Sequence, residues 1–123
     1  MNAHTIVKHL LEALPEGLEF QHRYEWHECG DEADSGEDNM LIVWAIPKGG
    51  SLRDAVGRAE FVFKDRRLLG NNVEVNQNYR RCGIATALYV YAEKETGLKA
   101  VPHSVQTPEG RSFWNQPDRP FGK

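Results

Sequence analysis

Residues 73–97 read VEVNQNYRRCGIATALYVYAEKETG, and this stretch carries the strongest structural signal in the chain. Val73 and Val75 alternate with polar residues, as in a short half-buried strand. From Ile84 onward, apolar residues recur at the spacing of one helix face, and Gly97 is a typical helix end. The stretch therefore predicts a strand, a loop and a helix in direct succession.

The loop between this strand and this helix has the composition of an anion-binding site. The first N–H groups of a helix lack backbone partners, and the helix dipole adds partial positive charge there, so a phosphate or pyrophosphate fits. Gly83 lets the backbone approach a ligand closely. Arg80 and Arg81 add positive charge. The same residues also fit an ordinary turn with a tight glycine and solvated arginines, and both interpretations stay open at this point.

The order Arg80-x-x-Gly83-x-Ala85 after an apolar strand resembles the acyl-CoA loop of the GNAT superfamily of N-acetyltransferases. In that family the pattern is Arg or Gln, two residues, Gly, one residue, then Gly or Ala. The resemblance extends over about residues 56–114 and is thin before them. It implies an α/β (α+β) GNAT-like fold, with a mixed, mostly antiparallel central sheet flanked by helices. The pattern is neither a P-loop nor a complete Rossmann fingerprint.

The resemblance also implies that acetyl-CoA is a co-substrate. Its expected contacts are the strand end, the loop and the first helical turn: Val73, Val75, Arg80, Arg81, Cys82, Gly83, Ile84 and Ala85. In the family, the strand diverges from its neighbour near Val75 and Asn76 and offers a backbone N–H to the thioester carbonyl. Trp114 is expected to pack along the pantetheine arm, although a role in the core fits it equally well.

Acetyl transfer to an amine needs a base for the ammonium proton and an acid for the departing thiolate. Glu74 is one candidate base, because several GNAT enzymes use a carboxylate on this strand. His103 is the other, because a free imidazole titrates near neutral pH. Each residue also fits a purely structural role. The family's usual acid is a tyrosine on the helix after the next strand, and the helix expected over residues 107–115 has none.

The composition indicates one soluble domain covering residues 1–123. The formal net charge of −3 argues against nucleic-acid binding, in spite of a basic set formed by Lys64, Arg66, Arg67, Arg80 and Arg81. No apolar run has the length of a membrane span, no signal pattern opens the chain, and two cysteines make no disulfide framework. We therefore expect a cytoplasmic protein without a membrane segment.

His22, His27 and Cys29 form a poor set of zinc ligands, and we expect no metal site.

The remaining periodicities predict a sheet preceded by one helix. The expected elements are a helix over 3–14, a strand over 18–27, an acidic loop over 28–38, strands over 40–47, 56–64 and 68–75, a turn over 65–67, a strand over 98–102, a helix over 107–115 and a flexible tail over about 115–123. A strand–helix–strand unit would place the strand over 98–102 parallel to Val73–Val75.

These features lead to two functional hypotheses. The first is an acetyl-CoA-dependent N-acetyltransferase that transfers an acetyl group directly to an amine of a small molecule or a protein. The second is a non-catalytic GNAT-like module that binds CoA or a protein partner. Only nine residues follow Trp114, where GNAT proteins usually have two more strands that shape the acceptor pocket. This short form favours the second hypothesis, and it also suggests that a homodimer completes the site.

Overall fold

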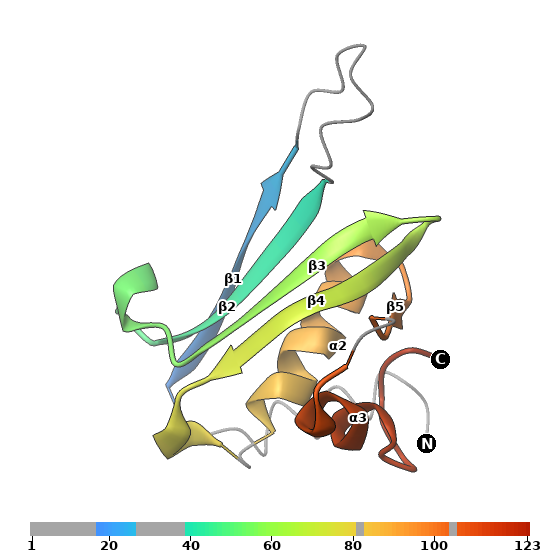
Figure 1. Ribbon diagram of the computed structural model, residues 1–123. Helices are drawn as coiled ribbons and strands as arrows, with labels where there is room; N and C mark the ends of the chain where they lie inside the picture. The colour runs from blue at the N-terminus through green and yellow to red at the C-terminus, as the bar shows by residue number, and fades with distance from the viewer. Residues whose placement is uncertain (1–16, 27–38, 81–82, 104–105) are drawn as a thin grey trace.

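The computed structural model describes residues 17–26, 39–80, 83–103 and 106–123. They form a five-stranded sheet in the order β1-β2-β3-β4-β5, shown in Figure 1. The strands are β1 (Leu18–Glu25), β2 (Met40–Pro47), β3 (Gly57–Lys64), β4 (Arg67–Val75) and β5 (Ala100–Val101). The helices are α2 (Ile84–Thr96) and α3 (Pro108–Trp114), with short 3-10 turns η1 (Leu52–Asp54) and η2 (Gln77–Tyr79).

The first four strands form an antiparallel meander, and β5 pairs with β4 in parallel. The mostly antiparallel α+β architecture, the strand–loop–helix unit and the helix that begins after Thr107 are thus confirmed. The turn between β3 and β4 is confirmed too, with positive φ angles at Asp65 and Arg66. Two-residue hairpin turns use such angles because they match the twist of the strands. The helix expected over 3–14 and the acidic loop over 28–38 lie outside the described residues.

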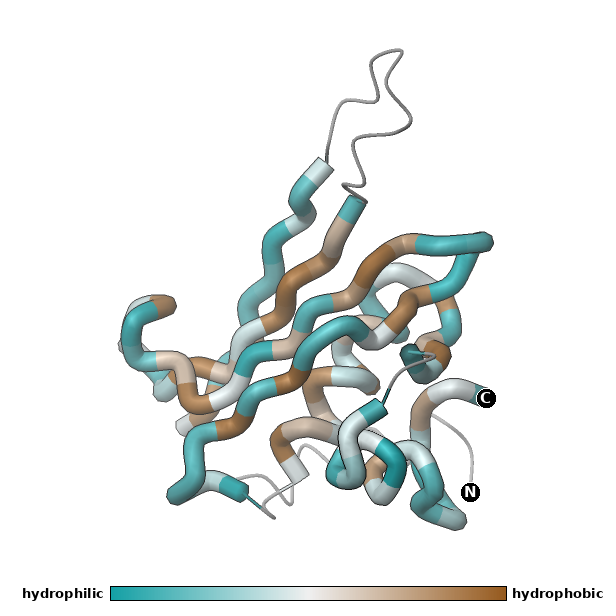
Figure 2. Tube along the Cα trace, viewed as in Figure 1, coloured by the Kyte–Doolittle hydropathy of each residue, from teal (hydrophilic) through white to brown (hydrophobic). Residues whose placement is uncertain are grey.

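In the described part of the chain, both helices lie on one face of the sheet (Figure 1). The main core lies between α2 and the strands, where Leu41, Val43, Phe61 and Leu88 are buried. Figure 2 shows that hydrophobic residues concentrate on β2 and its neighbours, whereas β1 is largely hydrophilic. This agrees with the continuous apolar run of β2 and the alternating burial of β1, whose half-buried residues face α2.

The opposite face of the sheet, here called the outer face, has a small apolar cluster of Ile42, Trp44 and Ile46. The guanidinium groups of Arg23 and Arg58 lie 5.3 Å and 6.0 Å from the centre of the Trp44 ring. Long charged side chains can cover apolar surface with their stems while their charged ends stay in water. They help to bury Trp44 on a face where the described residues supply no helix.

A β-bulge in β4 decides which side chains face the helices. Phe61 pairs with Gly70 and Glu60 pairs with Asn72, so Asn71 is an extra residue in β4. The extra residue shifts the alternation of the strand by one position. Val73 and Val75 consequently pack against the main core.

The strand β5 pairs with only the first half of β4. Leu68 is opposite Ala100 and Leu69 is opposite Val101. The expected parallel direction is confirmed, but the expected position beside Val73–Val75 is wrong. The strand has two residues, and Glu93 of α2 accepts the N–H of the first of them, Ala100, at 2.6 Å. In the described residues, no strand pairs with the second half of β4 on this side.

The C-terminal segment, for which the sequence predicted a flexible tail, packs under α3. Phe121 is fully buried and contacts Tyr89, Phe113 and Trp114. Arg119 donates hydrogen bonds to the Trp114 and Phe121 carbonyl oxygens. A single aromatic residue among prolines and polar residues gives no periodic signal, so the sequence pattern could not reveal this packing.

A candidate cofactor cleft between β4 and α3

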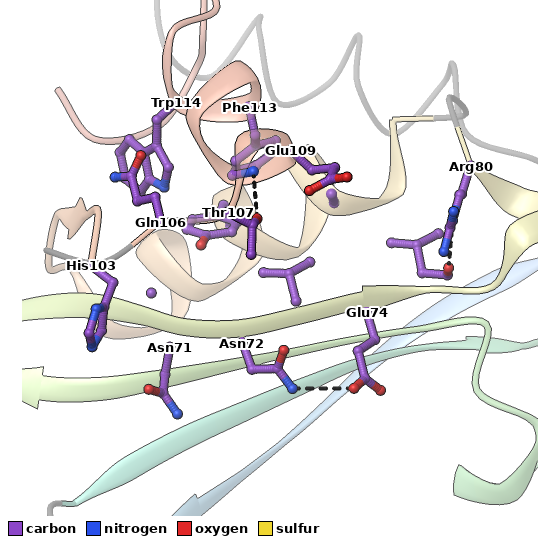
Figure 3. Close-up of a pocket in the computed structure, with 16 residues that line it drawn as sticks. Asn71, Asn72, Glu74, Arg80, His103, Gln106, Thr107, Glu109, Phe113 and Trp114 are labelled. Atoms are coloured by element: carbon purple, nitrogen blue, oxygen red, sulfur yellow. Dashed lines mark hydrogen bonds between the residues drawn. The ribbon is translucent and has the colours of Figure 1, made fainter.

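The open half of β4, the start of α2 and the helix α3 enclose a cleft of about 770 Å³. Its volume lies within the range of small-molecule binding sites. Figure 3 shows Asn71, Asn72 and Glu74 projecting from β4 away from the two helices, whereas Thr107 and Phe113 lie on the helix side. The cleft therefore presents two chemically different sides to a ligand that passes between β4 and α3.

The backbone of Val73 and Val75 faces the cleft. The Asn76 N–H donates to the Val56 carbonyl oxygen at 2.7 Å, which fixes the hydrogen-bond alternation between β3 and β4. By that alternation, the N–H and C=O groups of Val73 and Val75 point away from β3. The Asn76 N–H is thus already used within the sheet, and of the two expected donors only Val75 remains.

The loop before α2 has the geometry that its glycine predicts. Gly83 precedes the helix with φ +79°, in the left-handed region that favours glycine. Apart from Gly83 and its two chain neighbours, no atom of the described residues lies within 4 Å of the position where a Cβ would stand on Gly83. The Nε of Arg80 donates to the Val75 carbonyl oxygen at 3.3 Å, which holds the start of the Arg80 side chain beside the cleft.

The other expected cofactor contacts divide into three groups. Ala85 is half-buried and lines the cleft. Ile84 is 1% exposed and its side chain packs in the core, so only its backbone is available to a ligand. Arg81 and Cys82 lie outside the described residues.

The two candidate bases, Glu74 and His103, both line the cleft. Glu74 is exposed on the outer face of the sheet, where its Oε1 accepts a hydrogen bond from Asn72 Nδ2 at 3.4 Å. His103 is half-buried just beyond β5, as the sequence order predicted. The structure thus brings both residues to the same cleft from different strands.

Trp114 lines the cleft but is 8% exposed. Its ring contacts Tyr89, Phe113 and Phe121, and the Arg119 guanidinium lies 5.4 Å from its centre. The structure therefore places it mainly in the aromatic core of the C-terminal part. Phe113 is more exposed and stands on the helix side of the cleft.

Tyr89 is a cleft residue that the sequence analysis missed. It lies on α2, is 3% exposed, and reaches the cleft beside Gly70. Burial raises the pKa of Tyr89 to about 12, and a hydrogen bond from the Trp114 side chain lowers it in part. The indole N–H is only a donor, so the Tyr89 oxygen accepts this bond and keeps its own proton for another partner. Helical spacing alone marks Tyr89 as a core residue, and its hydroxyl is the one feature that points to a site.

Gly70 is what makes room for this hydroxyl. A Cβ on Gly70 would overlap the Tyr89 hydroxyl oxygen. Gly70 directly follows Leu69, the last β4 residue that pairs with β5, and directly precedes the bulge at Asn71. The Tyr89 hydroxyl therefore stands at the fork where β4 and β5 separate.

Comparisons with known proteins identify no family for this chain: no protein-family model matches it, and no curated protein has a matching sequence. In the described residues, no helix is long and apolar enough to cross a membrane. Within the same residues, no three His, Cys, Asp or Glu side chains gather in a way that could hold a metal ion.

Proposed function

We propose that this protein is an acetyl-CoA-dependent N-acetyltransferase with a GNAT-like fold. The observation that carries the proposal is the fork between β4 and β5. Two parallel strands pair over two residue positions, and the backbone N–H groups of Val73 and Val75 then point toward a cleft. The N-terminus of a 13-residue helix opens at the far end of this cleft, with Arg80 beside it.

The residues at that end fit the phosphate groups of CoA. The helix N-terminus favours an anion through its N–H groups and its dipole. The open space at Gly83 gives a pyrophosphate access to these groups. Arg80 supplies positive charge at the edge of the cleft. Acetyl-CoA would contribute an acetyl group activated as a thioester.

The backbone of β4 would orient the thioester. An N–H at Val75 is a suitable donor to the carbonyl oxygen, because a fixed backbone dipole needs no reorganisation when negative charge develops there. Glu74 would accept a proton from the acceptor ammonium, directly or through water, from the outer face of the sheet, and the resulting amine would attack the thioester carbonyl as the C–S bond breaks. His103 is the second group at the cleft that can take this proton.

Tyr89 would donate a hydrogen bond to the departing sulfur. Its hydroxyl stands at the fork and its proton is held, since the raised pKa of about 12 keeps the phenol neutral at physiological pH. In this proposal, Tyr89 of α2 takes the role of the tyrosine that GNAT enzymes usually have on the helix corresponding to α3, which has none here. The high pKa makes Tyr89 a hydrogen-bond donor rather than a strong acid, so we assign it stabilisation of the thiolate.

The experiment that tests the function is a thiol-release assay with acetyl-CoA and a broad panel of amines. Glu74→Gln should lower turnover by about 100-fold if Glu74 is the base. Glu109→Gln is the matched control, because Glu109 also lines the cleft but lies on the helix side. A fall in His103→Asn with full activity in Glu74→Gln would assign the base to His103 instead.

The alternative hypothesis, a non-catalytic CoA-binding module, predicts a different result in the same assay. Wild-type protein would then bind acetyl-CoA without releasing thiol for any amine in the panel. Tyr89→Phe distinguishes the two cases further, because it keeps the aromatic packing and removes only the hydroxyl. We expect Tyr89→Phe to lower turnover by roughly tenfold while binding of acetyl-CoA persists.

A further inference from the structure

The strand β1 is an edge of the sheet in the described part of the chain. It pairs with β2 along all eight of its residues, and no described strand lies on its other side. A strand edge presents unpaired N–H and C=O groups and so forms a template for another strand. The eight-residue length makes this edge long for a domain of 123 residues.

The hydrogen-bond alternation shows which residues face outward. The Lys48 N–H donates to the Gly17 carbonyl oxygen, so odd-numbered residues of β1 direct their backbone toward β2. The even-numbered residues direct theirs to the open edge, and their side chains lie on the half-buried α2 face: Leu18, Phe20, His22 and Tyr24.

We propose that this edge pairs antiparallel with β1 of a second copy of the chain, centred on Gln21. The pairing joins the two sheets into one. It places Glu19 opposite Arg23 of the partner subunit on the outer face, and by symmetry this happens twice. Opposite charges directly across an antiparallel pair are favourable, and like charges are unfavourable.

Charge complementarity selects this register among the neighbouring ones. Backbone hydrogen bonding requires that even-numbered residues lie opposite even-numbered residues. A pairing centred on His22 would place Glu19 opposite Glu25, and one centred on Arg23 would place that arginine opposite itself. Centring on Gln21 avoids both repulsions. A pairing centred on Phe20 avoids them too, but it places Glu19 opposite Gln21 and Arg23 opposite Gly17, so it lacks the two opposite-charge pairs.

The α2 face of the same register also fits. Leu18 lies opposite Tyr24 of the second copy, and Phe20 lies opposite its His22. These side chains are half-buried in one copy, and pairing removes more of their surface from water. Trp26, which is 61% exposed and stacks on Tyr24 with ring centres 5.3 Å apart, continues this row at the end of β1.

Sedimentation velocity over a range of protein concentrations tests the pairing. We expect the mass to rise from 14.0 kDa to twice that value as the concentration increases. Glu19→Arg and Arg23→Glu should each weaken association by roughly tenfold or more, since each sets like charges opposite one another. The double variant Glu19→Arg/Arg23→Glu should restore the dimer, because it exchanges the two charges without changing the register.

A cysteine cross-link tests the register itself. In a background with Cys29→Ser and Cys82→Ser, Gln21→Cys should form an intersubunit disulfide under mild oxidation, because Gln21 faces its own symmetry mate at a close, non-hydrogen-bonded position. Arg23→Cys in the same background is the control and should not cross-link. Circular dichroism confirms that each variant is folded.

Three outcomes would overturn the proposal. The first is a wild-type chain that stays monomeric at every concentration. The second is a double charge-exchange variant that stays as weak as the single variants. The third is a stronger cross-link in Arg23→Cys than in Gln21→Cys, which would show that the strands pair in another register.

Discussion

Gly70 and Tyr89 form a matched pair at the fork of the sheet. The hydroxyl occupies the space that a side chain on Gly70 would need. Phe61, Phe113, Trp114 and Phe121 surround the Tyr89 ring, which leaves it little room to move away. The position of this hydroxyl is therefore fixed by packing, as a functional group requires.

Gly70→Ala should destabilise the protein by about 1–3 kcal/mol, the usual cost of overpacking a well-filled site. Removal of the Tyr89 hydroxyl in the double variant Gly70→Ala/Tyr89→Phe should recover much of this loss. Urea unfolding of the wild type, both single variants and the double variant gives the coupling free energy. Additive effects would show that the two groups do not meet at the fork.

Glu93 is a second residue whose role follows from burial. Burial raises its pKa, while hydrogen bonds from the Ala100 and Gly122 backbone and the charges of Lys99 and Arg119 lower it in part. The two N–H donors lie 2.6 Å and 2.8 Å from Oε2. Glu93 thus joins α2 to both β5 and the C-terminal segment.

The direction of the Glu93 pKa shift determines how the contribution of Glu93 to the stability of the fold depends on pH. Because the folded-state pKa is raised, the stability that Glu93 contributes is present below the ordinary glutamate pKa of 4.5 and is lost as the pH rises through the folded-state pKa. Glu93→Gln keeps an oxygen acceptor and removes the titration. We expect the stability of Glu93→Gln relative to the wild type to increase between pH 4 and pH 7, as measured by urea unfolding at both values. An unchanged difference would contradict the assigned cause.

At the scale of the elements, the bulge in β4 has the largest effect on the site. If β4 alternated regularly through Asn71, without the bulge, Val73 and Val75 would face outward and Glu74 would face α2. The bulge therefore supplies both the apolar packing of β4 and the exposure of the candidate base. The alternation of apolar and polar residues in a strand cannot reveal a bulge, because the extra residue, here Asn71, looks like an ordinary polar residue in the sequence.

Deletion of Asn71 should accordingly destabilise the fold by no more than about 1 kcal/mol, since it removes the extra residue of the bulge and leaves Val73 and Val75 facing α2 and Glu74 facing outward. Thermal unfolding followed by circular dichroism measures the loss. Asn71→Ala is the matched control, which keeps the length of the strand and should stay close to the wild type. A deletion variant that melts far below Asn71→Ala would show that removal of Asn71 turns Val73 and Val75 outward, contrary to its assignment as the extra residue.

The elements with regular periodicity were predicted from the sequence. The apolar run of β2, the alternation of β3 and the spacing of α2 each reflect one dominant packing direction. Thr107 caps α3 as expected, with its Oγ1 accepting the Gly110 N–H at 3.1 Å. The position of β5 and the packing of the C-terminal segment involve Glu93 and Phe121 instead, whose partners are distant in sequence. A local sequence pattern therefore could not predict these two features.

The candidate site likewise has residues that a local pattern predicts and residues that only the fold brings together. Arg80 and Gly83 were predicted because a loop before a helix has a local signature, and the structure places Arg80 at the cleft and Gly83 at the N-terminus of α2. Glu74 and His103 come from different strands, and only the fold shows that they line one cleft. Tyr89 could not be predicted as a site residue from the sequence, because this requires knowing which side of α2 faces the fork between β4 and β5.

At the scale of the whole molecule, the sheet has two edges with different properties. At one edge, β4 and β5 separate and leave the cleft in which we place acetyl-CoA. At the other edge, β1 presents a strand that is complementary to itself. The two features lie on opposite sides of the sheet (Figure 1), so the proposed pairing would leave both clefts of a dimer accessible.

The most direct test of the proposed function is calorimetric titration of the purified protein with acetyl-CoA, with CoA and ATP as comparison ligands. We expect micromolar binding of acetyl-CoA, no comparable binding of ATP, and loss of binding in Arg80→Ala and in Gly83→Glu, which would fill the space at the start of α2. Absence of acetyl-CoA binding by the folded wild-type protein, or undiminished binding by Gly83→Glu, would contradict the proposed function.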